Sequence, residues 1–527
     1  QNTFMSCTNG ENFKNPVDGS GNTLLELETW FTAQSGNVIN DKPMLGANGQ
    51  PIAGSPLLGA GQDVANTVDA FFDTVDFVGA LNDSDDWREG WAFGYGGGEV
   101  TAPPAVAGCP SGTTSISPVD GSTTTCEVSG RITADLTLTA GNYYALSGAV
   151  FVGDDNADSA TLTIEPGVTV YGRTGDDYLV ISRGSKINAN GTKDEPISFT
   201  SSQDVMGGTT AAGQWGGLVL LGNAPSNKCP AEGDCALQVE GVESGAVFGG
   251  TDTTDNSGTL RYVRVMNGGY EIAPDNELNG ITFGGVGSGT TVEYVQVHQN
   301  ADDGVEFFGG NVQAKYLVLT SIQDDSIDWD NGFQGKMQHI LVKQAADNSD
   351  ANRGIEADND GTTPSKTPKS NPTIANLTII GNTFDGEDDS EGMYFREGTG
   401  AQIYNTIVTG PEGMGECLEI EGAASGESET VNNAQDGTLM IKSSVIACSE
   451  NFKDPSGVDF SVENWWTNTL GNLVATGQTQ VVNGIFTIDT TTATDVKAID
   501  GFFDTTTHIG AVSADNNWTE GWTVGLE

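Results

Sequence analysis

Residues 304–329 read GVEFFGGNVQAKYLVLTSIQDDSIDW, and this stretch carries the pattern that decides the fold. Two short segments of similar character, GVEF at 304–307 and SIDW at 326–329, flank the β-branched run AKYLVLTSI. The pattern returns as GIEA at 354–357, GMYF at 392–395 and CLEI at 417–420. Short strands that recur at solenoid spacing are typical of coils that stack on one another. We therefore predict a mostly β protein whose residues 127–448 form a right-handed parallel β-helix.

Alternate residues of a strand share a face, which divides these segments into two columns. The aliphatic column, predicted to line the interior, is Val305, Ile327, Ile355, Met393 and Leu418. The neighbouring Glu306, Asp328 and Glu356 then point outwards, about 4.8 Å apart on successive coils. Like charges at this spacing are unfavourable unless something neutralises them.

Ca²⁺ is the predicted neutralising partner, because it binds six to eight oxygens with tolerant geometry. The alternative is a solvated acidic face whose carboxyl pKa values are raised. Asp154-Asp155-Asn156-Ala157-Asp158 offers a second cluster of oxygens. The predicted metal ligands are Asp154, Asn156, Asp158, Asp302, Asp303, Glu306, Asp324, Asp325, Asp328, Glu356, Asp358 and Asp360.

The charge of the chain excludes several classes of partner. With 72 Asp and Glu against 21 Lys and Arg, the formal charge of −51 repels nucleic acid and anionic membrane surfaces. The absence of a long apolar run argues against insertion into a bilayer. The start at Gln1, without a leader, fits a mature secreted protein.

The cysteines fall into three local pairs. Cys109 and Cys126 bracket a polar loop, Cys229 and Cys235 close a short loop, and Cys417 and Cys448 flank adjacent predicted strands. We predict three disulfides and an oxidising, extracytoplasmic location, the alternative being buried free thiols. Cys7 is left without a partner.

The two ends of the chain carry related sequences. ENFKNP at 11–16 returns as ENFKDP at 450–455, and DWREGW at 86–91 returns as NWTEGW at 517–522. We predict α+β modules at 1–98 and 449–527, with a linker at 99–126. In each module, helical spacing is followed by FFD and GA segments predicted as short strands. The tryptophans are predicted to form a core or a lid, the alternative being a sugar-binding platform.

Catalytic motifs are missing from the sequence. The three His, at 298, 339 and 508, form no zinc motif or catalytic triad. Parallel β-helices often cleave acidic polysaccharides, but a polyuronate groove needs several Lys or Arg, and residues 292–430 hold few. We therefore predict no catalytic residues and a protein that is not an enzyme, the alternative being a polysaccharide lyase or glycoside hydrolase.

The residues at 277–310, 324–342, 353–360 and 509–522 resemble a family of secreted bacterial β-helix proteins. Within that family the chain is most similar to the surface-layer (S-layer) proteins of marine gammaproteobacteria. The resemblance implies a structural protein of a Gram-negative marine bacterium that self-assembles into a Ca²⁺-supported lattice outside the outer membrane, with an outer-membrane glycan as a further partner. The repeated end modules are predicted to mediate subunit contacts or to cap the ends of the β-helix. The alternative function is polysaccharide binding or degradation.

Overall fold

A computed structural model describes residues 108–527 apart from short stretches at 243–244, 273–276, 347–349, 385–389, 424–425, 476–480, 483, 489–490 and 527, together with isolated residues of the first 107. The chain divides into two compact units, Gln1–Pro104 and Ala105–Glu527. The first unit contains a short parallel pair, β1 (Thr3–Phe4) with β2 (Val38–Ile39). Most of the predicted module at 1–98, including Cys7, lies outside the described residues.

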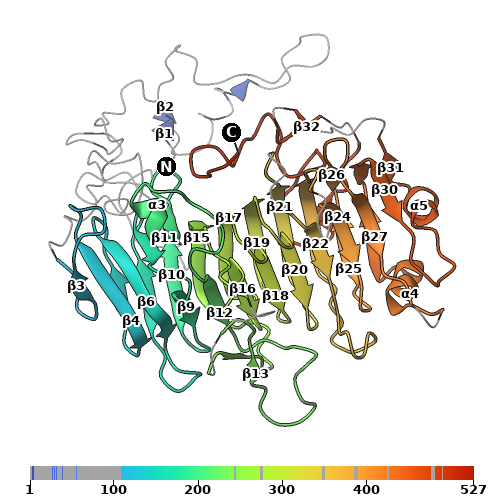
Figure 1. The fold of residues 1–527 in the computed structure, drawn as a ribbon. Helices are drawn as coiled ribbons and strands as arrows, with labels where there is room; N and C mark the ends of the chain where they lie inside the picture. Colours follow the sequence, from blue (N-terminus) through green and yellow to red (C-terminus); the bar gives the residue numbers. More distant parts are fainter. Residues whose placement is uncertain are drawn as a thin grey trace, which may run out of the picture. The chain divides into compact units, whose positions relative to one another are not determined.

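The second unit is a parallel β-helix, as predicted (Figure 1). One face of each coil is a short strand, and these strands pair in parallel along the solenoid. They are β9 (Tyr178–Ile181), β12 (Leu218–Leu221), β16 (Ile281–Gly284), β18 (Val305–Phe308), β20 (Ile327–Asp330), β22 (Arg353–Ala357), β24 (Glu391–Phe395), β27 (Glu416–Ile420) and β30 (Glu450–Lys453).

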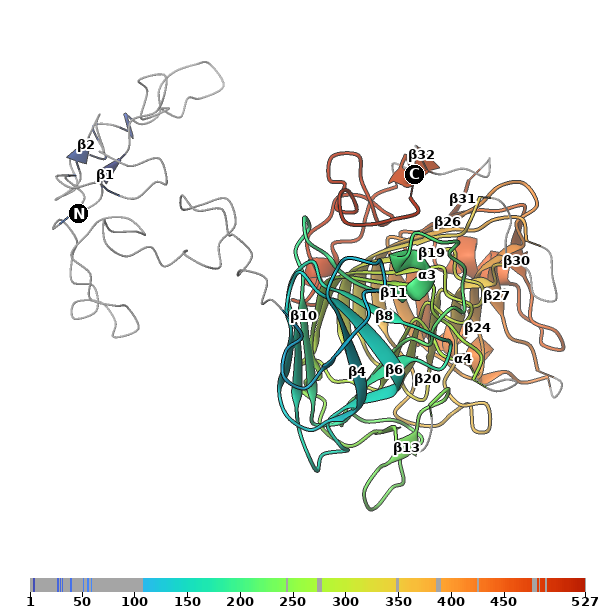
Figure 2. The ribbon, with the colours of Figure 1, turned by 60° about the vertical axis from the view of Figure 1, so that its left-hand side comes forward.

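Two further faces come from the two halves of long, bent strands. In the middle of the solenoid these are β15 (Gly258–Met266), β17 (Thr291–His298), β19 (Gln313–Thr320), β21 (Lys336–Lys343) and β23 (Thr373–Ile380). In later coils separate strands take over the two halves: β25 (Ala401–Tyr404) with β26 (Ile407–Thr409), and β28 (Leu439–Lys442) with β29 (Val445–Ala447). The solenoid starts with β4 (Thr125–Ile132), and Figure 2 looks more nearly along the stack of coils.

The interior of the solenoid is the apolar column predicted from the sequence. Val305, Ile327, Ile355, Met393 and Leu418 are all at most 1 % exposed and occupy equivalent positions on successive coils. Aromatic rings stack beside them, with Phe307 between Phe283 and Phe333 at centroid distances of 5.0 and 4.4 Å. This apolar interior supplies most of the apolar burial that stabilises the fold.

Small residues precede the aliphatic column because neighbouring coils approach closely there. A Cβ atom on Gly304 would lie 2.6 Å from the carbonyl oxygen of Ser326. On Gly392 it would lie 2.2 Å from the carbonyl oxygen of Cys417. The small residues at this position are therefore a packing requirement of the stack.

The C-terminal end of the interior is closed by short helices. α5 (Val462–Asn464) continues into a π-helical turn, Trp465–Thr469, whose two tryptophans are buried in the main core. The Trp465 indole donates to the carbonyl oxygen of Ala434 in α4 (Glu429–Asp436). Among the described helices, none is long and apolar enough to cross a bilayer.

A column of left-handed residues marks the bend between the second and third faces. Tyr262, Tyr294, Tyr316 and His339 have φ between 47° and 60°, and Asn376 and Asn405 continue the series at 54° and 57°. The first four rings are stacked, with centroids 4.5, 4.4 and 4.8 Å apart. We call the side chains of these six residues, with the residues that flank them on the same strands, the cradle.

Residues 494–526 lie along the cradle, and we call them the strap (dark red in Figure 1). Trp522 packs edge-on against Tyr262 and Tyr294, and Trp518 against Tyr316. The Asn376 side chain donates to the carbonyl oxygen of His508 at 2.9 Å. The tryptophans thus form a lid over the outer surface of the β-helix.

The strands predicted for the FFD and GA segments are absent from the described strap. Residues 500–503 form a turn, and Gly510-Ala511 has no strand pairing among the described residues. The backbone of the strap bonds to cradle side chains instead: Asp504 N–H donates to Gln338, and Ala511 N–H donates to Thr378. Side chains that satisfy the backbone in this way remove the need for a neighbouring strand.

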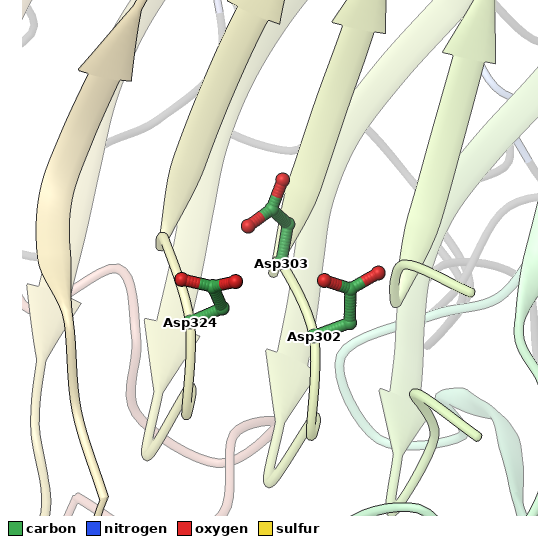
Figure 3. Close-up of side chains that lie close together, drawn as sticks. All are labelled: Asp302, Asp303 and Asp324. Carbon is green, nitrogen blue, oxygen red and sulfur yellow. The ribbon is translucent and has the colours of Figure 1, made fainter. Parts of the chain in front are cut away.

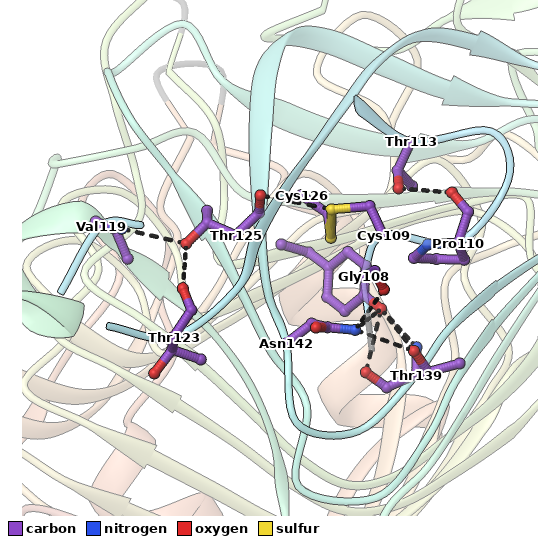
Figure 4. The surroundings of a disulfide bond; sticks show 11 residues. Gly108, Cys109, Pro110, Thr113, Val119, Thr123, Thr125, Cys126, Thr139 and Asn142 are labelled. Carbon is purple, nitrogen blue, oxygen red and sulfur yellow. Dashed lines mark hydrogen bonds between the residues drawn. A yellow bond between two sulfur atoms is a disulfide. The ribbon is translucent and has the colours of Figure 1, made fainter. Parts of the chain in front are cut away.

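All three predicted disulfides are formed: Cys109–Cys126, Cys229–Cys235 and Cys417–Cys448. Figure 4 shows the first, where Cys126 is fully buried on β4 and the neighbouring Thr125 hydroxyl accepts from the Val119 backbone. The third joins β27 to the residue that follows β29, and it therefore ties two consecutive coils together.

Removal of Cys417–Cys448 should destabilise the β-helix more than removal of Cys229–Cys235. The two bridges span sequence separations of 31 and 6 residues. Loop-closure entropy predicts that Cys417→Ser with Cys448→Ser lowers the free energy of unfolding by about 3–4 kcal/mol. For Cys229→Ser with Cys235→Ser the predicted loss is about 2 kcal/mol. Urea unfolding of the two double variants measures both, and equal losses would contradict the loop-closure explanation.

Candidate metal centre

The predicted column of outward-facing carboxylates is present on the short-strand face. The strand register places Glu306 beside Asp328 and Asp328 beside Glu356. The turns that precede β18 and β20 add Asp302, Asp303, Asp324 and Asp325. We call these seven residues the acidic ladder.

Three overlapping groups within the ladder bring carboxylate oxygens within 4.8 Å of one another. They are Asp302, Asp303 and Asp324; Asp303, Glu306 and Asp328; and Asp325, Asp328 and Glu356. Asp303 belongs to the first two groups and Asp328 to the last two. Figure 3 shows the first group, in which three side chains from two consecutive turns lie close together.

Hydrogen bonds between coils hold these carboxylates in place. Asp303 accepts from the backbone N–H of Asp325 at 3.0 Å, and Asp325 accepts from that of Arg353 at 3.0 Å. Both aspartates are buried, with 6 % and 4 % of their surfaces exposed. Asn279 donates to Glu306 at 2.5 Å. These carboxylates are thus fixed by hydrogen bonds from neighbouring coils.

Positive charge is concentrated at one end of the ladder. Glu356 accepts from Arg353 and Arg396 at 3.0 and 2.9 Å. Towards β18, the Arg353 guanidinium comes no closer to the Asp325 carboxylate than 4.0 Å. The buried Asp328 Oδ1 has no hydrogen-bond partner among the described residues. Within the described part of the chain, no salt bridge joins Asp303 or Asp328 to a basic side chain, so the groups around them concentrate negative charge.

Burial and mutual repulsion shift the titration of the ladder. Burial, with the nearby carboxylates of Asp324 and Glu277, raises the pKa of Asp302 to about 7. Burial likewise raises the pKa values of Asp303, Glu306, Asp325 and Asp328 well above the ordinary range, and neighbouring acids raise them further. Either protons or a cation must accompany these groups at neutral pH.

Without divalent cations, the protein should lose stability as the pH rises from about 4 to about 8. Asp302 and Glu391 have pKa values raised to about 7, and Asp358 to about 8. In this window the folded state binds more protons than the unfolded state, so increasing pH favours unfolding. Thermal melts in chelator should show the decline. Asp302→Asn with Glu391→Gln should flatten the pH dependence of the melting temperature, and an unchanged slope would contradict the assignment.

Two predicted ligands at the far end are engaged by basic side chains. Asp358 forms an ion pair with Arg396, whose Nε lies 2.9 Å from Asp358 Oδ1. Asp360 pairs with Lys228 at 3.0 Å and Lys366 at 3.1 Å. Burial opposes ionisation of Asp360, but these hydrogen bonds and those from Thr363 and Thr362 lower its pKa. Neither residue belongs to the three carboxylate groups described above, although both remain predicted ligands.

The second predicted cluster lies in a turn away from the ladder. Asp154 pairs with Arg131 at 3.1 Å and forms an isolated backbone bridge with Asp158. The Asn156 side chain donates to Asn223 at 2.9 Å. Within the described part of the chain, the three do not join a group of converging carboxylates.

Two acidic neighbours of the ladder, Glu391 and Asp330, were missed from the sequence. Glu391 lies beside Arg353 in the register. Burial raises the pKa of Asp330 to about 6. Lys336, which lies near the ladder in the sequence, instead pairs with Asp500 of the strap. The alignment of coils could have found Glu391, since it precedes GMYF as Arg353 precedes GIEA.

Comparison with known families agrees with this architecture. The family model described as a pectate-lyase-like β-helix domain matches residues 130–523. No curated protein and no solved structure gives a match to the chain. The matched range contains the acidic ladder and most of the strap. On this evidence the chain belongs to the pectate-lyase-like β-helix domain family.

Proposed function

We propose that this chain is a secreted polysaccharide-binding protein in which Ca²⁺, held along the acidic ladder, binds an acidic glycan. The observation that carries the proposal is the series of overlapping carboxylate groups around Asp303 and Asp328. Hard carboxylate oxygens are the ligands that Ca²⁺ prefers. The three disulfides support an extracellular location.

The ladder offers a partial coordination shell. Each group supplies three carboxylates, whereas Ca²⁺ takes six to eight oxygens. Asp328 Oδ1, buried and lacking a hydrogen-bond partner among the described residues, is suited to a cation. Glycan carboxylate or sulfate oxygens would complete the shell together with water.

A bound cation also explains how so acidic a protein would hold a polyanion. Arg353 and Arg396, the basic residues beside the ladder, are engaged with Glu356. Lys453 is engaged with Glu419 at 2.9 Å. With a formal charge of −51, the protein alone would repel an acidic glycan. These basic side chains are paired with carboxylates of the protein. Bound Ca²⁺ would therefore supply the positive charge that attracts the glycan.

The test is binding of polygalacturonate and alginate, with neutral dextran for comparison, in Ca²⁺ and in EDTA. The expected result is Ca²⁺-dependent binding of the acidic polymers, lost in Asp303→Asn with Asp328→Asn. Asp176→Asn with Asp515→Asn changes the charge equally at exposed positions and should bind normally. Binding that ignores EDTA, or equal losses in both variants, would overturn the proposal. Appearance of unsaturated uronate ends would assign lyase activity to the same site.

A second candidate function is assembly into an extracellular array, the S-layer-like role implied by the resemblance. The observation in its favour is the repeat of DAFFDT at 69–74 as DGFFDT at 500–505, because related contact sequences at both ends suit an open assembly. Divalent cations between acidic copies would reduce their repulsion. Electron microscopy of purified protein with and without Ca²⁺ tests this role, and monomers at every concentration and Ca²⁺ level would overturn it.

A further inference from the structure

The strap sequence occurs twice in the chain. Residues 69–94 read DAFFDTVDFVGALNDSDDWREGWAFG, and residues 500–525 read DGFFDTTTHIGAVSADNNWTEGWTVG. The two align without a gap. The structure shows what the second copy contacts, so each identical position can be assigned a role.

The identical positions include the side chains by which the strap is held. Asp500 pairs with Lys336 at 2.6 Å, and Asp504 pairs with Lys315 at 2.8 Å. Asp504 also accepts from the Tyr316 hydroxyl at 3.1 Å. The first copy has Asp69 and Asp73 at these positions. Both acidic anchors are therefore retained.

The aromatic contacts are retained as well. Trp518 and Trp522 cover the stacked cradle rings, and Trp522 is fully buried. The first copy has Trp87 and Trp91 at the same spacing. Tryptophans packed against aromatic rings stabilise a contact by more than their buried area alone would provide. An unrelated segment would not preserve both the charges and the indoles.

Two of the differences between the copies are compatible with the same surface. His508 is replaced by Phe77, and the buried His508 Nε2 has no hydrogen-bond partner among the described residues. A phenyl ring removes that unsatisfied nitrogen. Thr519 donates to Asn517 in the strap, and the first copy has Arg88 and Asp86 there, which preserves a donor and an acceptor.

We infer that the cradle of one molecule binds residues 69–94 of a second copy of this chain, in place of the first molecule's own strap. Such a contact joins different surfaces of the two copies and can continue into an open series. This inference deepens the array proposal and is independent of glycan binding. The tethered strap competes at an effective concentration of the order of millimolar, so exchange is favoured at high protein density.

Cysteine cross-linking between two full-length chains tests the contact. The Ala511 N–H donates to the Thr378 hydroxyl at 2.8 Å, and Ala80 aligns with Ala511. With Cys7 replaced by Ser in every chain, one chain carries Ala80→Cys and the other Thr378→Cys. Oxidation should give a dimer whose 80–378 disulfide is identified by mass spectrometry. A single chain with Thr378→Cys and Ala511→Cys should link internally and calibrates the position.

Matched tryptophan variants make the result specific. Trp518→Ala with Trp522→Ala in the Thr378→Cys chain weakens its own strap and should raise the dimer yield several-fold. Trp87→Ala with Trp91→Ala in the Ala80→Cys chain should reduce the yield to background. If the 378–511 control links but no 80–378 dimer forms even with the weakened strap, the inference is overturned. Arrays without the 80–378 link would keep the array proposal and reject this contact.

Discussion

In calcium-free buffer at about pH 8, Asp303→Asn with Asp328→Asn is expected to melt at a higher temperature than the unsubstituted protein. Both carboxyls are crowded by other acids, and burial raises their pKa values. The substitutions remove two buried acidic groups whose ionisation opposes folding, and an amide at 328 can donate to Glu306 or Glu356. A stabilising effect from the loss of two charges is unusual, and it follows directly from the acidic ladder.

Saturating Ca²⁺ should reverse the order of the two melting temperatures. A ligand that binds the folded state stabilises it by about 4 kcal/mol when its free concentration is about 1,000-fold above Kd. The unsubstituted protein gains this stabilisation from Ca²⁺. The double variant should not, because it has lost ligands from all three carboxylate groups. Calorimetric melts across a Ca²⁺ titration, at constant ionic strength, measure both curves.

Two controls separate a site from general screening of charge. Asp176→Asn with Asp515→Asn makes the same change in net charge at exposed positions, so it should leave the Ca²⁺ response intact. Mg²⁺ prefers smaller, stricter octahedral geometry and should stabilise less. A Ca²⁺ response that is identical in both double variants would reject the ladder as the binding site.

The second large effect is expected from Trp329→Ala, at about 3–5 kcal/mol of lost stability. Trp329 is fully buried in the interior, and its indole donates to the Thr399 hydroxyl at 3.0 Å. The next coil has Ala357 at the same position, and Phe395 follows, with its ring centroid 6.4 Å from that of Trp329. Removal of the indole therefore leaves a cavity that spans more than one coil.

Urea unfolding and hydrogen exchange measure this effect and its extent. Coils contact their nearest neighbours in a solenoid, so protection should fall most in β18, β20 and β22. Trp329→Phe retains most of the ring and should cost less, while Tyr270→Ala removes a ring that is 36 % exposed and should be nearly neutral. Equal losses for Trp329→Ala and Tyr270→Ala would show that the interior is not closely packed.

The part of the fold that repeats could be predicted from the sequence. Val305 and Ile327 recur at equivalent positions because strands alternate their side chains and coils stack in register. The same alternation predicts Glu306 beside Asp328, and the strand register confirms this pairing. The cysteine pairs were predictable because each is local or joins consecutive coils.

What does not repeat was harder to predict. The strap was predicted to contain strands, because its apolar residues do not reveal that amide side chains such as Gln338 and Asn376 would bind its backbone. The cradle had a visible signal, the series RYV, EYV, KYL and QHI at 261–263, 293–295, 315–317 and 338–340. No sequence signal predicted the left-handed backbone of the cradle tyrosines, because tyrosine rarely adopts this conformation. Likewise, the pairing of Asp360 with Lys228 joins residues far apart in sequence.

The strap has a consequence for how this chain can evolve. Solenoids ordinarily gain or lose whole coils without harm, because each added coil repeats the same local contacts. Here the strap bonds to Gln296 on β17, Gln338 on β21 and Asn405 beyond β25. Insertion or deletion of one coil between β17 and β25 would displace every later anchor by about 4.8 Å. The contacts of the strap therefore fix the number of coils between β17 and β25.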